Sequence, residues 1–519
     1  MADGVGIDLG TTHCCLFVYK HGRNPQVVKN RAGDTTTPSW VRLERDGIDV
    51  GKQAKRQSPD HSRNTVRNAK RLIGRSFDDA AVTMERSLMP FSIINDNGSP
   101  GIRVEQYNES GEVIWAKLTR PEEISAKMLA YLKEMAETFL GNEVTTAVVT
   151  IPANFIETQR SATLTAARLA GFTEVSLLNE PTAAAIAYGG VVDEQCTILV
   201  FDFGGGTLDI SIMKVEGRNE YRVLSTDGDM YLGGENFDVE IVQHFLEDIR
   251  RRHNIDLAKD SKSLAKLKLV AEEAKIALSS PYTPIYRDTV YKLHGEFDYN
   301  VELTKATFNG MFGFLLEEIL VPLKNALEAA KLSPEEIDKV ILVGGSSRLP
   351  AVKEALQAFF GREGVVCADA DPDEAIARGA AMQSYRINNR QAANVQEVTA
   401  YHYGLKVVED LQVGSTRIRE LIPRGKVYPT SVTKAFVTAY DNQDEVDFEV
   451  YQSKRGFSLD KFRIGHFVIP DLPLRKAGEC MFDVTYSIDG NNILHATAEG
   501  KDEIAHYKKN IEIRLDNVV

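Results

Sequence analysis

Two hydrophobic patterns follow one another along this chain, and they predict two kinds of fold. Up to about residue 389, short apolar runs alternate with longer segments in which apolar residues recur at three- and four-residue spacing. From about residue 399, apolar and polar residues alternate with period two between turns rich in Gly, Asp, Asn and Pro. The first pattern is typical of an α/β domain, and the second is typical of a β-sandwich.

Residues 1–388 therefore form the first predicted domain, and residues 399–519 form the second. Helices are expected in the first domain over residues 122–140, 157–170, 262–278 and 307–332. Strands are expected there over residues 145–151, 197–203 and 340–343. The segment 389–398 between the domains is polar and has little periodicity, which indicates a short linker.

Charge and cysteine content narrow the class of protein. The chain of 519 residues has 61 Lys and Arg against 74 Asp and Glu, a net charge of −13, which argues against nucleic acid as a partner. Its five cysteines include no C-x-x-C pair, so neither a disulfide framework nor a zinc site is expected. The N-terminus does not resemble a signal peptide and no apolar run is long enough to span a bilayer, so we expect a cytosolic protein without membrane contact.

One hairpin pattern occurs twice in the first domain. Residues 4–19 (GVGIDLGTTHCCLFVY) and 198–213 (ILVFDFGGGTLDISIM) each contain an apolar strand, an Asp, a Gly-containing turn with Thr, and a second apolar strand. The backbone N–H groups of such a turn converge on one point and bind phosphate. Asp8 and Asp202 occupy matching places, where a carboxylate holds Mg²⁺ through its waters. Two lobes that close on one triphosphate are predicted; two ordinary tight hairpins are the alternative.

Other phosphate-binding motifs are weak or absent. Gly344 and Gly345 follow a buried strand, which is where ligands of α/β sheets bind, but Gly-Gly at such a turn is common. No P-loop pattern occurs, and the glycines at 4, 6 and 10 lack the strand that precedes a dinucleotide fingerprint. Residues 202–204 spell the metal motif of protein kinases, yet no H-R-D precedes them.

Several longer motifs occur in a fixed order along the chain. They are GIDLGTTHC, KRLIGR, NEPTAAAIAYG, FDFGGGTLDIS, LGGENFD, EEAKIALSS, LVGGSSRLP and DPDEAIARGAA, followed by TAYDNQDEVDFEVYQ and FDVTYSIDGNNILHATA. As a set they resemble the seventy-kilodalton heat-shock chaperone family of the DnaK type, over nearly the whole chain. The resemblance implies an actin-like, two-lobed α/β ATPase domain followed by an all-β sandwich that binds peptides.

The resemblance also implies roles for individual residues. Lys70 would reach the γ-phosphate and the attacking water, Glu180 would orient that water, and Thr207 would lie beside the γ-phosphate. Asp8, Asp202 and Glu180 would hold Mg²⁺ through water. The other implied ATP contacts are Gly10, Thr11, Thr12, His13, Gly204, Gly205, Gly206, Asp209, Glu272, Lys275, Ser279, Gly344, Gly345, Ser346, Arg348 and Asp373. The implied cofactors are ATP or ADP, Mg²⁺ and K⁺; a solvated surface residue is the alternative for a lone Lys such as Lys70.

In the second domain, the resemblance implies a channel for an extended peptide. The positions that match its lining are Val408, Phe436, Ala439, Val446 and Phe448. Backbone hydrogen bonds and one apolar pocket would hold the peptide. The alternative is that these apolar residues belong to the core of the β-sandwich.

Four departures from the family affect communication between the domains. The linker lacks the family's run of leucines, so we expect little apolar area to favour its docking, and weak coupling. Ser176 replaces an arginine that contacts J-domain co-chaperones, and Asn154 replaces a tyrosine, whereas the interdomain residues Pro152 and Arg160 are kept. No segment corresponding to the helical lid follows the β-strands, so fast peptide exchange is expected.

The sequence thus predicts a slow, Mg-dependent ATPase that acts as a monomeric heat-shock chaperone on unfolded or nascent polypeptides. The family implies J-domain and nucleotide-exchange partners, although Ser176 argues against the first. The alternative is a regulatory or ribosome-associated co-chaperone that uses ATP mainly to hold its shape. A sugar kinase of the same superfold is a third hypothesis, but the β-sandwich has no role in it.

Overall fold

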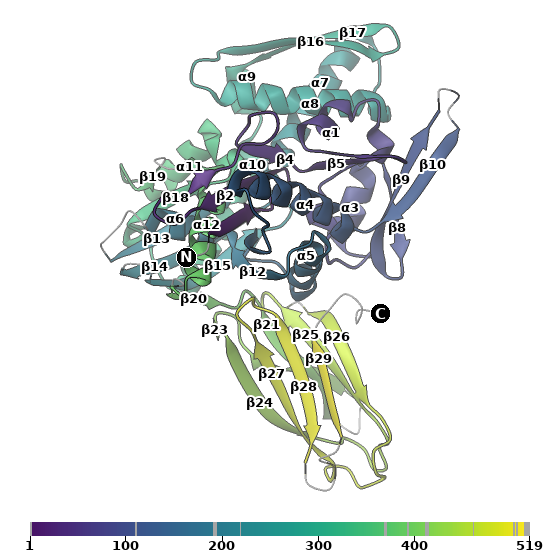
Figure 1. Cartoon of the computed structure of the whole chain (residues 1–519), viewed down its shortest axis with the longest axis vertical. Coiled ribbons are helices and arrows are strands. Elements are labelled where there is room, and N and C mark those ends of the chain that lie inside the picture. The colour runs from purple at the N-terminus through teal and green to yellow at the C-terminus, as the bar shows by residue number, and fades with distance from the viewer. Residues whose placement is uncertain are drawn as a thin grey trace.

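In the computed structural model, an α/β part and a β-sandwich (the β-domain) lie end to end (Figure 1). The structure describes residues 3–108, 110, 112–189, 195–217, 220–367, 371–391, 394–410, 415–459, 461–501, 504 and 507–512. No helix within these ranges is both long and apolar enough to cross a lipid bilayer. The predicted last strand runs beyond residue 512, so its end lies outside the described residues.

The α/β part is built on two sheets that follow the same plan, and each contains one of the two repeated hairpins. The first sheet has the order β12-β11-β1-β2-β3, with β4 also paired to β2: β1 (Gly4–Asp8), β2 (His13–Tyr19), β3 (Gln26–Val27), β4 (Thr36–Pro38), β11 (Thr146–Ile151) and β12 (Glu174–Asn179). The second has the order β19-β18-β13-β14-β15-β20-β23: β13 (Cys196–Phe203), β14 (Leu208–Gly217), β15 (Glu220–Asp229), β18 (Lys339–Val343), β19 (Val366–Cys367), β20 (Asn394–Val398) and β23 (Val427–Tyr428). In each, an antiparallel hairpin pairs in parallel with a later strand.

Helices and small sheets cover these two sheets. The first lobe carries α1 (Lys52–Gln57), α2 (Ala69–Leu72), α3 (Ala80–Leu88), α4 (Pro121–Leu140), α5 (Glu157–Leu169), β5 (Trp40–Leu43), β6 (Ile48–Val50), β7 (Thr65–Arg67), β8 (Ser92–Asp96), β9 (Ser99–Tyr107) and β10 (Val113–Thr119). The second carries α7 (Gly234–His253), α8 (Ser261–Ser279), α11 (Pro350–Phe360), β16 (Ile285–His294) and β17 (Phe297–Thr304). Between the sheets, α6 (Glu180–Gly189) packs on α12 (Ala375–Asn388), where a Cβ on Gly379 would lie 1.8 Å from the carbonyl oxygen of Ala183. Only glycine allows this approach.

The single helix predicted over residues 307–332 is wrong, because the structure has two helices there. They are α9 (Lys305–Gly310) and α10 (Gly313–Ala330). A glycine stands on each side of the break, and glycine weakens a helix interior. Phe312 lies at the break and is buried, with its ring edge-on to that of Phe308 at 4.9 Å. The break thus lets both rings enter the core of the second lobe.

The β-domain packs two antiparallel sheets face to face. One has the order β22-β21-β25-β26: β21 (His402–Asp410), β22 (Ser415–Ile422), β25 (Val446–Ser453) and β26 (Phe462–Ile469). The other has the order β24-β27-β28-β29: β24 (Thr430–Val437), β27 (Met481–Ile488), β28 (Leu494–Gly500) and β29 (Lys508–Glu512). The predicted alternation is confirmed in β27, where Phe482, Val484, Tyr486 and Ile488 are all buried.

The expectation that the linker has too little apolar surface to dock is wrong for this structure. Strand β20 pairs in parallel with β15 and antiparallel with β23, so it continues the second sheet into the β-domain (Figure 1). Val398 is buried and Val395 packs on the cluster around α6. The buried Glu397 carboxylate accepts a hydrogen bond from Thr182 Oγ1. Backbone hydrogen bonds between the strands and this polar contact stabilise the docked linker in place of the apolar contacts that leucines would make.

Candidate functional site

The turns of the two hairpins meet between the lobes. A Cβ on Gly205 would lie 2.3 Å from Thr12 Cγ2, and one on Gly206 would lie 2.7 Å from Thr11 Cγ2. Side chains larger than hydrogen would force the turns apart, so glycine is required for this contact. The structure therefore brings together two segments that lie nearly 200 residues apart, as their shared pattern predicts.

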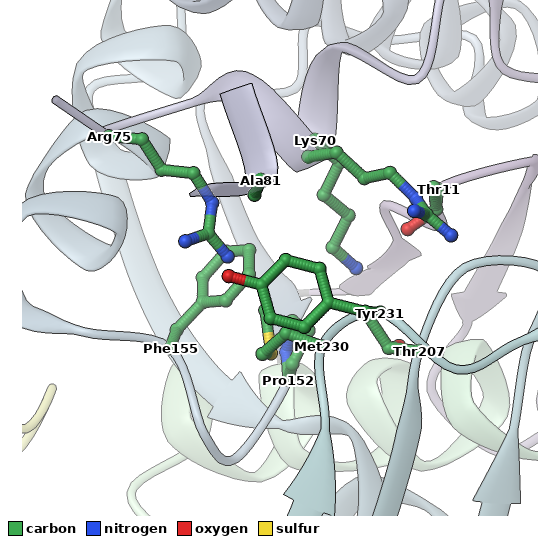
Figure 2. Close-up of a pocket in the computed structure, with 10 residues that line it drawn as sticks. Thr11, Lys70, Arg75, Ala81, Pro152, Phe155, Thr207, Met230 and Tyr231 are labelled. Carbon is green, nitrogen blue, oxygen red and sulfur yellow. The ribbon is translucent and has the colours of Figure 1, made fainter. Parts of the chain in front are cut away.

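Two buried carboxylates, one half-buried carboxylate and one buried ammonium group lie beside these turns. Lys70 Nζ, from α2, lies 2.5 Å from Glu180 Oε1 at the start of α6. Asp8 and Asp202 stand at or near the ends of β1 and β13, each directly before its turn. Figure 2 shows the Lys70 side chain directed toward the region between Thr11 and Thr207.

The charges of this cluster perturb one another strongly. Burial raises the pKa of Asp8 to about 7, repulsion from Glu180 adds to the rise, and Lys70 opposes it. Burial and Glu180 likewise raise the pKa of Asp202 well above its usual range. Burial lowers the pKa of Lys70, but attraction to Glu180 and Asp8 outweighs it, so that pKa is raised. Carboxylates in this arrangement favour a further cation nearby.

Mg²⁺ fits this donor set if the ion keeps its water shell. Among the described residues, no three His, Cys, Asp or Glu side chains are grouped closely enough to ligate a metal ion directly. Magnesium dehydrates reluctantly and is commonly held by few carboxylates through water. Asp8, Asp202 and Glu180 are the residues that would hold it, as the sequence predicts.

On the second lobe, residues from α7, α8 and the turn after β18 converge. Lys275 Nζ donates to the Gly234 carbonyl at 2.9 Å and pairs with Asp238 Oδ1 at 2.7 Å. A Cβ on Gly234 would lie 2.2 Å from Ser346 Oγ. Ser279, one turn beyond Lys275, donates to the Lys275 carbonyl at 2.7 Å. The structure thus places the predicted nucleoside contacts of α8 beside those of the 344–348 turn.

The remaining predicted nucleotide contacts lie around these. Gly344 has φ 78° and a Cβ there would lie 2.5 Å from the Phe203 carbonyl, which again requires glycine. Arg348 donates to Asp373 Oδ2 at 2.9 Å, and a Cβ on Gly345 would lie 3.0 Å from Asp373 Oδ1. His13 follows the first turn, and burial, with Lys55, lowers its pKa.

The sequence missed two charged contacts across the lobes. Lys55 of α1 pairs with Glu272 of α8 at 2.7 Å. Glu235 of α7 accepts from Asn68 Nδ2 at 2.8 Å and lies 3.6 Å from both Arg67 and Lys268. Burial opposes ionisation of Glu235, but these cations outweigh it and hold its pKa at about 2. Glu235 belongs to the LGGENFD motif, so the sequence marked this residue, but it did not indicate which residues contact it.

The predicted peptide-binding residues fall into two groups. Phe448 is 3 % exposed and lies in the β-domain core, its ring stacked on Phe467 at 5.0 Å, so the core alternative describes it well. Phe436 and Val446 are half-buried and pack on the same core. Val408 and Ala439 are also half-buried.

The interdomain residues lie between the site and the β-domain. Pro152 lines a small cavity with Lys70, Arg75 and Tyr231 (Figure 2). Arg160 is buried and donates from Nη2 to the Ala153 carbonyl at 3.0 Å. The segment after β11 is therefore fixed by α5.

Together, fold and site define an actin-like, two-lobed ATPase joined to a β-sandwich. The family model described as "Hsp70 protein" matches residues 4–518. "Heat shock 70 kDa protein BIP3" of Oryza sativa subsp. japonica is 39% identical over 507 residues, which cover 95% of this chain and 73% of that protein. A ribosome-associated molecular chaperone of Nakaseomyces delphensis and one of Saccharomyces cerevisiae are each 36% identical over 534 residues, covering 100% of this chain and 83% of each relative. The chain belongs to the Hsp70 protein family and is an ATPase and chaperone of the heat-shock type.

Proposed function

We propose that this chain hydrolyses ATP slowly with Mg²⁺ between its lobes and binds extended apolar segments of unfolded or nascent polypeptides in its β-domain. The buried Lys70–Glu180 pair, beside Asp8, Asp202 and the two glycine turns, carries the proposal. A phosphate cradle next to a buried ammonium and buried carboxylates suits phosphoryl transfer to water.

Each part of the site has a separate task. The backbone of the 204–206 turn and of Thr11 and Thr12 cradles the phosphates. Lys70 stabilises the charge that develops on the γ-phosphoryl group, and Glu180 orients the attacking water. Mg²⁺, when bound near Asp8 and Asp202, neutralises negative charge on the phosphates. K⁺ is a further ion that the family resemblance implies.

Replacement of Lys70 tests the assignment. We expect Lys70→Ala to lower kcat at least about 100-fold, because the charge developing in the transition state loses its stabilising ammonium, while the ATP Kd changes little. Lys133→Ala is the control, since Lys133 pairs only locally with Glu137 at 2.6 Å. Phosphate release and calorimetric ATP binding are measured for both. Turnover that survives in Lys70→Ala would show that the roles are wrongly assigned.

For the β-domain, the half-buried Val408, Phe436, Ala439 and Val446 support a peptide channel, whereas Phe448 belongs to the β-domain core. Fluorescent extended peptides with a central Leu are the suitable probes. J-domain stimulation is expected to be weak, because Ser176 cannot supply the charged contact of an arginine. A monomer in the cytosol is the expected form.

A ribosome-associated role is the second candidate, because two of the similar chaperones carry that description. Sedimentation of the full chain with ribosomes, with and without nascent chains, distinguishes the two. Recovery with translating ribosomes supports this second role, whereas binding to unfolded clients in their absence supports a general chaperone.

A further inference from the structure

A small cavity adjoins the phosphate-binding turns, and we call it the arginine cavity because Arg71 and Arg75 line it. Thr11, Lys70 and Thr207, which the proposed function places around the γ-phosphate, line it as well. Figure 2 shows Thr11 and Thr207 to one side of the cavity and Arg75 to the other, with Lys70 between them. The cavity therefore leads away from the place that the γ-phosphate would take.

The lining of the arginine cavity is positively charged. Among the described residues, three cations and no carboxylate line it: Lys70, Arg71 and Arg75. All three are buried. The whole chain has a net charge of −13, so a buried wall of this sign differs from the rest of the protein. Charges act more strongly away from water, and this lining therefore favours an anion.

Each arginine of the cavity has an N–H group without an acceptor. Arg71 donates from Nη2 to the Gly206 carbonyl at 2.9 Å and from Nη1 to Glu85 Oε1 at 3.2 Å. Arg75 donates from Nη1 to Asp79 Oδ2 at 2.8 Å. These bonds fix both guanidinium groups, yet within the described part of the chain neither buried Nε atom has a hydrogen-bond partner. A buried donor without an acceptor is costly, and the oxygens of an anion would satisfy it.

The cavity is too small for phosphate in this structure. Its volume is about 10 Å³. This is about the space that one water molecule needs. A phosphate ion is several times larger than water, so the cavity must widen before phosphate can pass.

Tyr231 separates the cavity from solvent. It is 38 % exposed, whereas the two arginines are each 7 % exposed. Figure 2 shows its hydroxyl directed toward Arg75, whose guanidinium carbon lies 6.0 Å from the centre of the ring. Tyr231 stands between β15 and α7, and its N–H donates to Asp229 Oδ1 at 2.7 Å. Because the backbone is tied there, the aromatic side chain is the part that can swing outward.

The position of the product ADP favours a route on this side. The γ-phosphoryl group is the end of ATP that lies farthest from the nucleoside, and the predicted nucleoside contacts are on α8 and the 344–348 turn. Bound ADP therefore separates the cleaved phosphate from that side of the cleft. A route through the arginine cavity avoids ADP.

We propose that the arginine cavity is the exit for inorganic phosphate. After hydrolysis, the free anion moves from Lys70 to Arg71 and Arg75, and it reaches solvent when the Tyr231 side chain swings outward. No bond forms or breaks in this step, and ADP stays in place. This inference rests on the proposed ATPase function and adds the step that follows hydrolysis.

Release of radiolabelled inorganic phosphate tests the exit. The full chain is saturated with Mg-ADP and labelled phosphate, and the label is chased with excess unlabelled phosphate. We expect Tyr231→Ala to raise the dissociation rate at least about fivefold, because the ring no longer blocks the route. Tyr291→Ala is the control, since it removes a 72 % exposed ring from β16 that does not line the cavity. It should keep the wild-type rate.

The affinity for phosphate tests the arginines. We expect Arg75→Gln to raise the Kd for inorganic phosphate, measured with Mg-ADP bound, about tenfold, because a charged donor is lost. Arg86→Gln is the matched control. The Arg86 guanidinium also lies over an aromatic ring, that of Phe77 at 4.5 Å, but it does not line the cavity. Its Kd should equal that of wild type.

Three results would overturn the inference: no phosphate binding to the ADP complex, equal dissociation rates for Tyr231→Ala and Tyr291→Ala, or equal phosphate affinities for Arg75→Gln and Arg86→Gln. Equal dissociation rates would mean that phosphate leaves through the nucleotide cleft. All three are measured without turnover, so they leave the proposed ATPase function untouched. Absence of ATP cleavage in wild type would instead refute that function, and the exit with it.

Discussion

Glu157, at the start of α5, places a buried carboxylate in the contact between the ATPase part and the β-domain. Its two oxygens accept hydrogen bonds from the Tyr403 hydroxyl at 2.9 Å and from the Leu494 N–H at 2.8 Å. Burial raises the pKa of this carboxyl to about 7, with Asp489 adding to the rise, and Arg160 and the two donors oppose it. The docked state therefore binds a proton more readily than an exposed Glu does.

This raised pKa predicts a pH-dependent stability. Since the folded pKa exceeds the ordinary value of 4.5, the proton stabilises the docked fold below about pH 4.5 and that stabilisation is lost as the pH rises to about 7. Glutamine has no charge to bury. We therefore expect the free energy of unfolding of Glu157→Gln, taken relative to that of wild type, to rise between pH 5 and pH 8 by at most about 3 kcal/mol. Urea unfolding midpoints of both proteins at pH 5, 6, 7 and 8 measure the difference. A pH-independent difference would contradict the prediction.

Among the helices and strands, local sequence patterns predicted the hairpins, but they did not predict contacts between residues far apart in the chain. The two hairpins carry their own signal in the Asp and the glycine turn, so their meeting could be anticipated. The Lys70–Glu180 pair joins residues whose positions only a family resemblance connected, since nothing in KRLIGR itself indicates a partner 110 residues away. β20 docks because it pairs with the edges of β15 and β23. The composition of the linker itself does not indicate that these two strands lie beside it.

Val398 provides a test of that docking. It is 6 % exposed, and it pairs across β20–β23 with Val427, which is 42 % exposed. We expect Val398→Asp to release the linker, because an unpaired buried carboxylate next to Glu397 costs at least about 3 kcal/mol. Limited proteolysis within residues 389–398 should then be faster than in wild type. Val427→Asp places the same charge on the exposed partner strand and should leave cleavage unchanged; equal cleavage of both variants and wild type would show that Val398 does not hold the linker.

In the whole molecule, the contacts between the docked β-domain and the α/β part bear on whether the bound nucleotide controls the rate of peptide release. Asp227 of β15 lies 3.2 Å from Arg424 and 3.1 Å from Lys454 of the β-domain, and its side chain is buried. Arg424 also donates to the Thr226 carbonyl at 2.6 Å. The linker's composition predicts that ATP changes the peptide off-rate little, whereas this charged contact, together with docked β20, predicts measurable coupling.

Peptide dissociation from the full chain in ATP and in ADP separates these expectations. If docking couples the domains, the ratio of the two off-rates in wild type should reach about tenfold, which corresponds to about 1.4 kcal/mol of coupling free energy. Asp227→Asn leaves two cations facing a neutral amide and should bring the ratio toward one, because the removed carboxylate stabilises only the docked state. Asp483→Asn, which breaks a pair with Lys501 within the β-domain at 2.8 Å, should keep the wild-type ratio. A wild-type ratio near one would instead support the linker-based prediction, and the docked interface would then hold the two domains together without transmitting the nucleotide state.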